Sequence, residues 1–229
     1  MPEGQTRTHG YGDRRNPDDN IQSSVHRIRS PELVAGRVPV RDDDRGHPNA
    51  EHQLEQRREG IQNLKRRDLL SVEALSDISV PTLAEHIRPA GYFNIKAKRL
   101  KNLIVFIQEK YEGDLDELFS RDTETIRTEL LSVRGIGLET ADSMILYGAG
   151  RALFVVDTYT HRILSRHNLI GEEAAYYDLQ ALFMDNLPHE VELFQEFHAL
   201  IVKTGKDYCR KKPLCSDCPL EHINREIHG

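Results

Sequence analysis

The chain has 229 residues, of which 38% are hydrophobic and 30% are charged, and its formal net charge is −6. This length permits one large domain or two small lobes with a buried core. No apolar run reaches the roughly 18 residues that a membrane span needs, and the first 17 residues lack the apolar stretch of a secretory signal. We therefore expect a cytoplasmic protein that does not coat nucleic acid through bulk charge.

The first sixty residues differ from the rest in composition. They contain only 12 hydrophobic residues, with ten Arg and no Lys, whereas all seven Phe follow position 90. This segment shows neither a helical nor a strand period of hydrophobicity, so we expect residues 1–59 to be disordered. We divide the remainder into a helical domain over residues 60–205 and a cysteine-rich loop and tail over residues 206–229.

After this segment the hydrophobic pattern predicts one helix after another. Residues 62–70 form a short amphipathic stretch, and Ser71 is a suitable N-cap for the helix that follows. Pro81 suits the first turn of the next helix, and residues 94–111 predict a long helix with one apolar face. That face contains Ile95, Leu100, Leu103, Ile104 and Ile107.

The second half of the chain continues in the same way. Asp114 and Asp122 are suitable N-caps for helices over LDELF and TETIRTELLSV. Three more helices follow Arg151, over VVDTYTHRILSRH, YYDLQALFMDNL and EVELFQEFHALIVK. No segment alternates over the length of a strand with hairpin signals beside it. The predicted fold is therefore all-α.

A short turn between two of these helices is the most informative motif. The helix over ETIRTELLSV is followed by Arg134, Gly135, Ile136 and Gly137 and then by a helix over LETADSMILYG. Two glycines separated by one residue permit positive φ and a close approach of the backbone to a ligand. Amides of the turn and of the next helix then bind an anion, such as a DNA phosphate, without sequence preference. A tight turn without a ligand is the alternative.

The residues around this turn resemble a known family. Asp157 lies 17 residues after Thr140, within the string VVDT, and the string IRPAGYFNIKAKRL lies upstream. With the cysteines downstream, the sequence resembles the endonuclease III (HhH-GPD) superfamily of helix-hairpin-helix DNA glycosylases over about residues 60–220. The branch that it resembles is the endonuclease III-related 3-methyladenine DNA glycosylases, which share the RP-x-G-aromatic-aromatic-N-x-KAKRL string and a GIG-x-E-[ST]-AD hairpin.

The resemblance implies an enzyme of base excision repair. Such an enzyme, which we expect to be a monomer, binds double-stranded DNA, flips out a damaged, here alkylated, base and hydrolyses its N-glycosidic bond. Asp157 matches the catalytic carboxylate of the family. A carboxylate there would stabilise the oxocarbenium character of the sugar and orient a water molecule. Asp157 is also a suitable N-cap, and the two roles do not compete.

Glu139 stands where bifunctional members of the family carry a lysine that forms a Schiff base with the sugar. A carboxylate cannot supply an amine nucleophile, so Glu139 favours a monofunctional glycosylase. An acidic residue favoured by the dipole in the first turn of a helix is the simpler explanation. Two alternatives stay open: an endonuclease III-like glycosylase with AP lyase activity on oxidised pyrimidines, and a non-catalytic helix-hairpin-helix module that only binds DNA.

Two basic groups are candidates for contact with phosphates. The first contains Arg88, Lys96, Lys98, Arg99 and Lys101; the second contains Lys203, Lys206, Arg210, Lys211 and Lys212. A run of charge is usually a solvated face, which is the alternative for the first group. The second lies where the cysteine loop of the family meets the DNA backbone. Besides the four residues of the turn, we expect contacts from Lys96, Lys98, Lys211 and Lys212.

The three cysteines of the chain are Cys209, Cys215 and Cys218. Their odd number and close spacing do not suit a disulfide framework and indicate a metal or cluster site. The resemblance implies a [4Fe–4S] cluster on these three thiols, although Asn224 stands where the family has its fourth cysteine. His222 would complete a Cys3His set, which also suits zinc. A loop without metal is the third alternative.

The N-terminal segment lacks the Trp-rich stretch and the A-I-L-T-Q-N-T motif of the family. Read one base later with suitable codons, residues 49–59 give T-Q-N-T-S-W-N-N-V-E-K, and the segment from Gly36 gives A-E-S-P-F-E-M-M-I-G-A-I-L. We therefore expect a one-base frameshift near Glu59 and Gly60, which leaves the N-terminal part of the fold missing or out of frame. A genuine disordered extension is the alternative.

Overall fold

The computed structural model describes residues 50–223, and over these residues it contains helices and no strand. The all-α prediction is confirmed. No helix in this part is long and apolar enough to cross a bilayer. The predictions for residues 1–49 and for Asn224 lie outside the described residues. The first helix of the described residues, α3, spans Ala50–Lys65, so the predicted boundary between residues 59 and 60 falls inside a helix.

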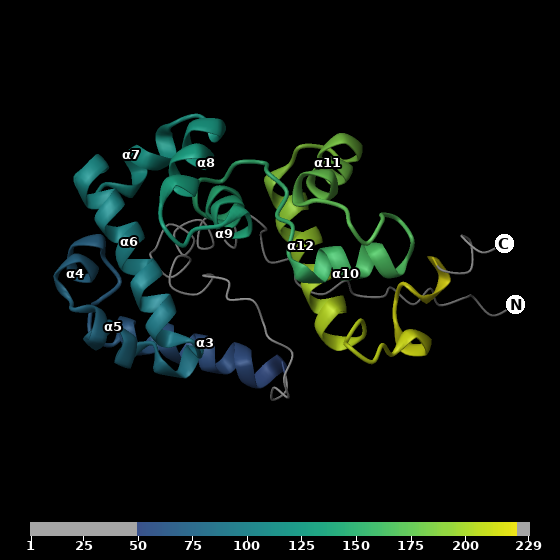
Figure 1. Cartoon of the computed structure of the whole chain (residues 1–229), viewed down its shortest axis with the longest axis horizontal. Coiled ribbons are helices and arrows are strands. Elements are labelled where there is room, and N and C mark those ends of the chain that lie inside the picture. The colour runs from purple at the N-terminus through teal and green to yellow at the C-terminus, as the bar shows by residue number, and fades with distance from the viewer. Residues whose placement is uncertain (1–49, 224–229) are drawn as a thin grey trace, which may run out of the picture.

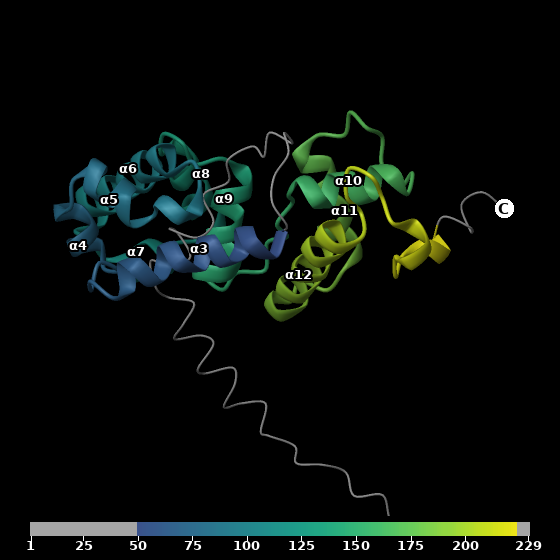
Figure 2. The ribbon, with the colours of Figure 1, turned by 90° about the horizontal axis from the view of Figure 1, so that it is seen from below.

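The helices form two lobes that lie side by side (Figure 1). The first lobe contains α3, α4 (Val72–Asp77), α5 (Val80–His86), the turn η1 (Arg88–Ala90), α6 (Phe93–Tyr111), α7 (Leu115–Ser120), α8 (Thr123–Ser132) and α9 (Leu138–Ser143). The second contains α10 (Thr158–Arg166), α11 (Tyr176–Asn186), α12 (Val191–Asp207) and the short turn η3 (Cys215–Asp217). Figure 2 shows both lobes from below, with α3 along the first.

Each lobe has its own hydrophobic core, and the two cores meet in the π-helical segment η2 (Met144–Gly148). Ile145 belongs to the core of the first lobe, whereas Leu146 belongs to that of the second. The helix-hairpin-helix therefore runs directly from one lobe into the other. Residues 149–157 then return the chain to the start of α10.

Most helix starts lie where the sequence predicts them. The Ser71 hydroxyl accepts a hydrogen bond from the Ala74 amide at 3.0 Å, and Asp114 and Asp122 cap α7 and α8 in the same way. Pro81 lies in the first turn of α5, as predicted. The expectation of a separate amphipathic stretch over residues 62–70 is corrected, because this stretch contains the end of α3 and the turn after it.

The long helix α6 forms the centre of the first lobe. Leu100, Leu103 and Ile107 are buried on its predicted apolar face. The predicted place of Ile95 on this face is wrong, because the residue is 45% exposed. It precedes Leu100 by five residues, which corresponds to a rotation of about 140° beyond one full turn, and so lies on another side of the helix. Lys96 is buried instead.

Candidate active site

The predicted hairpin is present as α8, a turn from Val133 to Gly137, and α9. The Ile136 amide donates a hydrogen bond to the Val133 carbonyl at 3.0 Å, and the Ile136 side chain is 7% exposed within the core. Only Gly135 adopts positive φ, at 98°, whereas φ is −107° at Gly137. Arg134 and both glycines are exposed. The expected contact of Ile136 with DNA is corrected, because its amide and side chain serve the turn itself.

Helix α6 holds this turn in place. The Asn102 side-chain amide donates a hydrogen bond to the Arg134 carbonyl at 2.8 Å. The side chain of Arg99 lies so close to Gly135 that a Cβ atom added there would be 2.6 Å from Cγ of Arg99. By contrast, no atom lies within 4 Å of a Cβ atom added at Gly137. Gly135 is thus required by packing, while Gly137 leaves open space for a ligand.

The first basic group does not form one exposed surface. The expected contact of Lys96 with DNA is corrected, because this residue is buried and its Nζ donates a hydrogen bond to the Ala90 carbonyl at 2.6 Å. Lys101 donates to three carbonyls at the end of α4, at 2.7 to 2.9 Å, which satisfies groups that the helix leaves unpaired. Lys98 is exposed.

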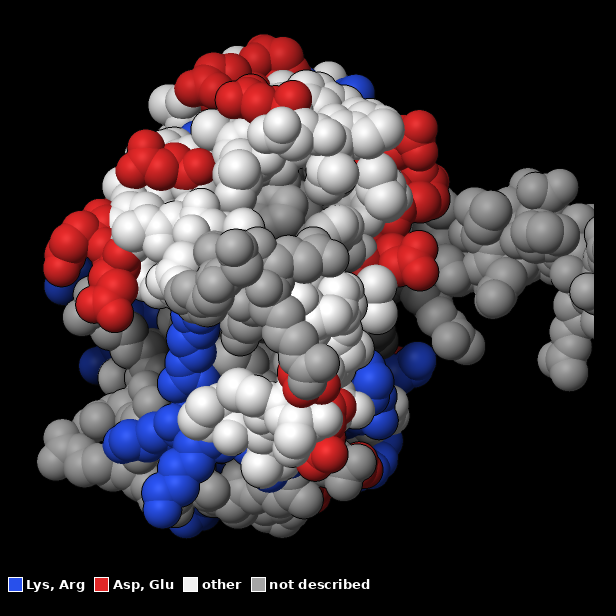
Figure 3. Space-filling view, turned by 90° about the vertical axis from the view of Figure 1, so that its right-hand side faces the viewer, with Lys and Arg blue, Asp and Glu red and all other residues white. Residues whose placement is uncertain are grey.

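The second basic group contains the exposed residues Lys211 and Lys212. They lie in the loop after α12, which Figure 1 shows on the lower side of the second lobe. Seen from that end of the molecule, basic side chains gather on the lower part of the surface and acidic ones above (Figure 3). The loop is tied to α10 by Arg166, whose guanidinium donates to the Arg210 carbonyl at 2.6 Å.

Asp157 is the N-cap of α10, as predicted. Its Oδ1 accepts hydrogen bonds from the Thr160 amide at 2.8 Å and from the Thr160 hydroxyl at 2.9 Å. The Asp157 amide contacts the same hydroxyl, which completes a capping box. The side chain of Asp157 is only 8% exposed. The capping therefore fixes one carboxylate oxygen and leaves Oδ2 for other contacts.

A cavity of about 240 Å³ brings Asp157 and Glu139 together. The other residues that line it are Val156, Thr158, His161, Ala174, Tyr176 and Leu179. It thus collects the end of the hairpin, the start of α10 and the start of α11 around one space. Among the described residues that line it there is no Lys or Arg. Its polar lining residues are Glu139, Asp157, Thr158, His161 and Tyr176.

The environment of Asp157 favours its ionised form. Burial by itself would raise the pKa of this carboxyl, but the interaction with His198 and the hydrogen bond from the Thr160 amide outweigh it. The pKa of Asp157 is therefore held below its usual value. A carboxylate that is both buried and ionised can stabilise positive charge on a neighbouring group.

A buried polar network that the sequence analysis missed supports the cavity from behind. Asp142 is fully buried and accepts hydrogen bonds from Arg127, Tyr176 and Gln180 at 2.7 to 2.9 Å. Burial, together with the charge of Asp142, raises the pKa of Tyr176. Gln180 also donates to the Phe154 carbonyl at 2.6 Å. The network thus joins both helices of the hairpin to α11 and to the segment before Asp157.

The three cysteines do not converge on one point. Cys209 is buried, and its Sγ lies 3.4 Å from Nη1 of Arg166, whereas Cys215 is exposed on η3. No group of three or more His, Cys, Asp or Glu side chains within residues 50–223 is arranged to hold a metal ion. His222 is exposed. The donor types suit iron or zinc, but the arrangement in this structure does not fit a cluster.

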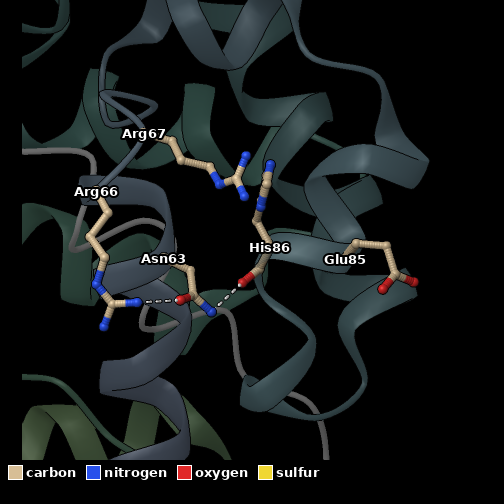
Figure 4. A pocket seen from close by; sticks show the side chains of 5 residues that line it. All are labelled: Asn63, Arg66, Arg67, Glu85 and His86. Carbon is tan, nitrogen blue, oxygen red and sulfur yellow. Dashed lines mark hydrogen bonds between the residues drawn. The ribbon is translucent and has the colours of Figure 1, made fainter.

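A second cavity, of about 480 Å³, lies in the first lobe between α3 and α5. It is lined by Asn63, Arg66, Arg67, Glu85 and His86, and Figure 4 shows how these side chains lie. Asn63 bridges Arg66 and the His86 carbonyl through hydrogen bonds of 3.0 and 3.2 Å. The cavity contains none of the predicted site residues, so we place the candidate active site at the smaller cavity beside Asp157.

Known proteins resemble the chain in sequence. Residues 52–189 match the family described as HhH-GPD superfamily base excision DNA repair proteins. A protein of Methanocaldococcus jannaschii named as a DNA repair glycosylase is 48% identical over 165 residues, which is 71% of this chain and 74% of that protein. Endonuclease III of Sulfolobus acidocaldarius is 29% identical over 150 residues, and the match spans 64% of its length.

Solved structures of DNA glycosylases also resemble the chain. The 3-methyladenine DNA glycosylase of H. pylori, bound to 1,N6-ethenoadenine, has 26% identity and a TM-score of 0.61, over 76% of this chain and 84% of that one. A trapped covalent endonuclease III–DNA intermediate has 18% identity and a TM-score of 0.66, which supports the fold. The chain therefore belongs to the HhH-GPD superfamily of base excision DNA repair proteins.

Proposed function

We propose that this protein is a monofunctional DNA glycosylase, which flips a damaged base out of double-stranded DNA and hydrolyses its N-glycosidic bond. Family membership and the buried, ionised Asp157 carboxylate support this proposal. As the base departs, the sugar develops oxocarbenium character. A fixed and largely buried carboxylate stabilises that charge and can orient the attacking water.

The substrate that we propose is a purine made cationic by alkylation. The observation that carries this is the cavity lining, in which Glu139 and Asp157 lie with Tyr176 and His161 and without a described Lys or Arg. Carboxylates and an aromatic face favour a positively charged base over a neutral one. An alkylated purine is also a good leaving group, so it needs no strong general acid. The similarity to the H. pylori enzyme, which is named a 3-methyladenine DNA glycosylase, supports the same class.

We propose that the DNA backbone is held by the exposed turn at Arg134, Gly135 and Gly137, with Lys98, Lys211 and Lys212 as further contacts. The open space beside Gly137 allows a phosphate to approach the backbone. Such contacts give affinity and register without reading the sequence. A module that only binds DNA would use the same turn but would not need a buried carboxylate beside a cavity.

The test is a panel of duplexes containing 3-methyladenine, 1,N6-ethenoadenine, an oxidised pyrimidine or no damage. We expect the fastest base release from 3-methyladenine, which is cationic in DNA, slower release from the neutral 1,N6-ethenoadenine, and none from the oxidised pyrimidine or the undamaged duplex. In Asp157→Asn the N-cap persists, because asparagine caps well, but the charge is lost. That variant should bind DNA as before and release bases more slowly by several orders of magnitude. Undiminished excision by Asp157→Asn would exclude the proposed chemistry.

A further inference from the structure

Asp157 is connected to a chain of buried polar groups that extends into the second lobe. Its Oδ2 lies 3.6 Å from Nε2 of His198, on α12. On the other side of the imidazole, Nδ1 lies 2.9 Å from the Tyr147 hydroxyl, on η2. That hydroxyl lies 3.5 Å from the Gln195 carbonyl. The side chains of His198 and Asp157 are only 9% and 8% exposed, so water does not screen this pair strongly.

The chemistry of these groups fixes where the proton on His198 lies. The ionised Asp157 carboxylate can only accept a hydrogen bond, so the Nε2 atom that faces it must carry a proton. In the neutral imidazole, Nδ1 then accepts from the Tyr147 hydroxyl. In the imidazolium, Nδ1 donates to that hydroxyl, which in turn donates to the Gln195 carbonyl. Both forms direct an Nε2–H group at Asp157.

Close contact between α10 and α12 sets the distance between His198 and Asp157. Gly205 packs so tightly against Tyr159 that a Cβ atom added to Gly205 would lie 2.4 Å from Cδ1 of the ring. Nearby, the Arg162 guanidinium donates a hydrogen bond to the Gly205 carbonyl at 3.1 Å. The two helices therefore cannot move apart freely at this point, and His198 is held next to the carboxylate.

We propose that His198 is a positioning residue for the catalytic carboxylate, with Tyr147 fixing the orientation of its ring. This rests on the proposed role of Asp157 in base release. Thr160 holds Oδ1 through two hydrogen bonds, and the buried Nε2 of His198, which has no hydrogen-bond partner among the described residues, lies 3.6 Å from Oδ2. The imidazole therefore limits the rotation of the carboxylate by close polar contact on its second side. A carboxylate fixed before the reaction stabilises the developing charge without reorganising. Without His198, Oδ2 loses its partner and the carboxylate can rotate.

Three substitutions separate this role from simple packing. The amide nitrogen of His198→Gln reaches the place of Nε2 and keeps a donor toward Asp157. The amide of His198→Asn reaches only the place of Nδ1, toward Tyr147, and His198→Ala removes both contacts. Under single-turnover conditions with saturating alkylated duplex, the Asn and Ala variants should lower the excision rate about 10- to 100-fold, as expected when a buried carboxylate loses a polar contact. The His198→Gln variant should keep an excision rate near that of the unsubstituted protein.

The dissociation constant for DNA should not change in any of the three variants, because His198 is buried away from the hairpin turn. His167 provides the matched control, since its side chain is buried to the same extent at the end of α10. His167→Ala should lower stability but leave the excision rate at saturating DNA unchanged. Equal rates in the three His198 variants, whether high or low, would overturn the proposal. So would a change confined to DNA affinity.

A spectroscopic measurement on the full chain tests the arrangement without relying on catalysis. In 15N-labelled protein, the resonances of His198 should show a proton on Nε2, and this pattern should change in Tyr147→Phe. A neutral ring protonated only on Nδ1 would overturn the proposal. If neither this chain nor the protein with its reading frame restored releases a base from any duplex, the proposed function fails, and this measurement still decides how His198 faces Asp157.

Discussion

Arg127 forms a two-point ion pair with Asp142, with its Nε and Nη2 atoms 2.7 and 2.9 Å from the two carboxylate oxygens. The pair joins the two helices of the hairpin, α8 and α9. Because Tyr176 and Gln180 of α11 bind the same carboxylate, it also links the hairpin to the second lobe. The hairpin turn and the cavity beside Asp157 are thus held by one buried charge.

This pair makes a prediction about stability. Arg127→Met leaves the fully buried Asp142 carboxylate without its cation, which should lower the free energy of unfolding by about 3–5 kcal/mol. Arg121→Met is the matched control, because Arg121 pairs with Glu117 on the surface, where both side chains are about half exposed. That change should cost no more than about 1 kcal/mol. Urea unfolding measures both, and equal effects would contradict the role of the buried pair.

The two glycines of the turn should respond differently to alanine. Gly135→Ala places a side chain at positive φ and against Arg99, so the free energy of unfolding should fall by at least about 1–2 kcal/mol. Gly137→Ala has room within the protein, and its stability should change by less than about 0.5 kcal/mol. DNA binding should nevertheless weaken in Gly137→Ala, because the methyl group occupies the space proposed for a phosphate. Unchanged affinity there would argue that the turn is only structural.

Glu139 predicts the absence of a covalent intermediate. A carboxylate cannot form a Schiff base with the sugar. Borohydride added during base release should therefore trap no protein on labelled DNA, as judged by denaturing gel electrophoresis. Glu139→Lys provides an amine at the same cavity, and trapping there would show that the position faces the sugar. Efficient trapping of the unsubstituted protein would mean that another amine acts as nucleophile and that the enzyme is bifunctional.

The cysteines carry a prediction that comes from the family resemblance. If Cys209, Cys215 and Cys218 bind an iron–sulfur cluster, anaerobically purified protein should be brown, with broad absorbance near about 400 nm. Such binding would require the loop to draw the three thiols together, since they do not converge in this structure. Iron and sulfide analysis measures it, with Cys215→Ser as a variant that should lose the colour. Stoichiometric zinc without iron would support the Cys3His alternative.

The expected frameshift is tested by resequencing the gene around the codons for Glu59 and Gly60. We expect a missing or additional base there. The frame-restored protein should then be soluble and release bases, whereas the 229-residue chain should be poorly soluble and inactive, because residues 1–59 have too few apolar side chains to cover the other helices. Every activity measurement above should be made on both proteins. An intact frame with a folded, active 229-residue product would exclude the frameshift.

The sequence by itself determined the helices, their N-caps and the hairpin, because these depend on residues within one or two turns of each other. Ser71, Asp114, Asp122 and Asp157 each cap a helix through an amide two or three residues away. The pattern from the hairpin to Asp157 was likewise sufficient to indicate the family, because it lies within one continuous stretch of chain.

Only the tertiary structure decided which polar side chains serve the fold and which serve the site. Lys96 belongs to a basic string in sequence, but its position on α6 buries it against η1. Asp142 and His198 look like ordinary residues of amphipathic helices. Their partners Gln180 and Asp157 lie about forty residues away along the chain. Contacts of that kind depend on how helices pack, and local periodicity contains no information about which distant side chains will meet.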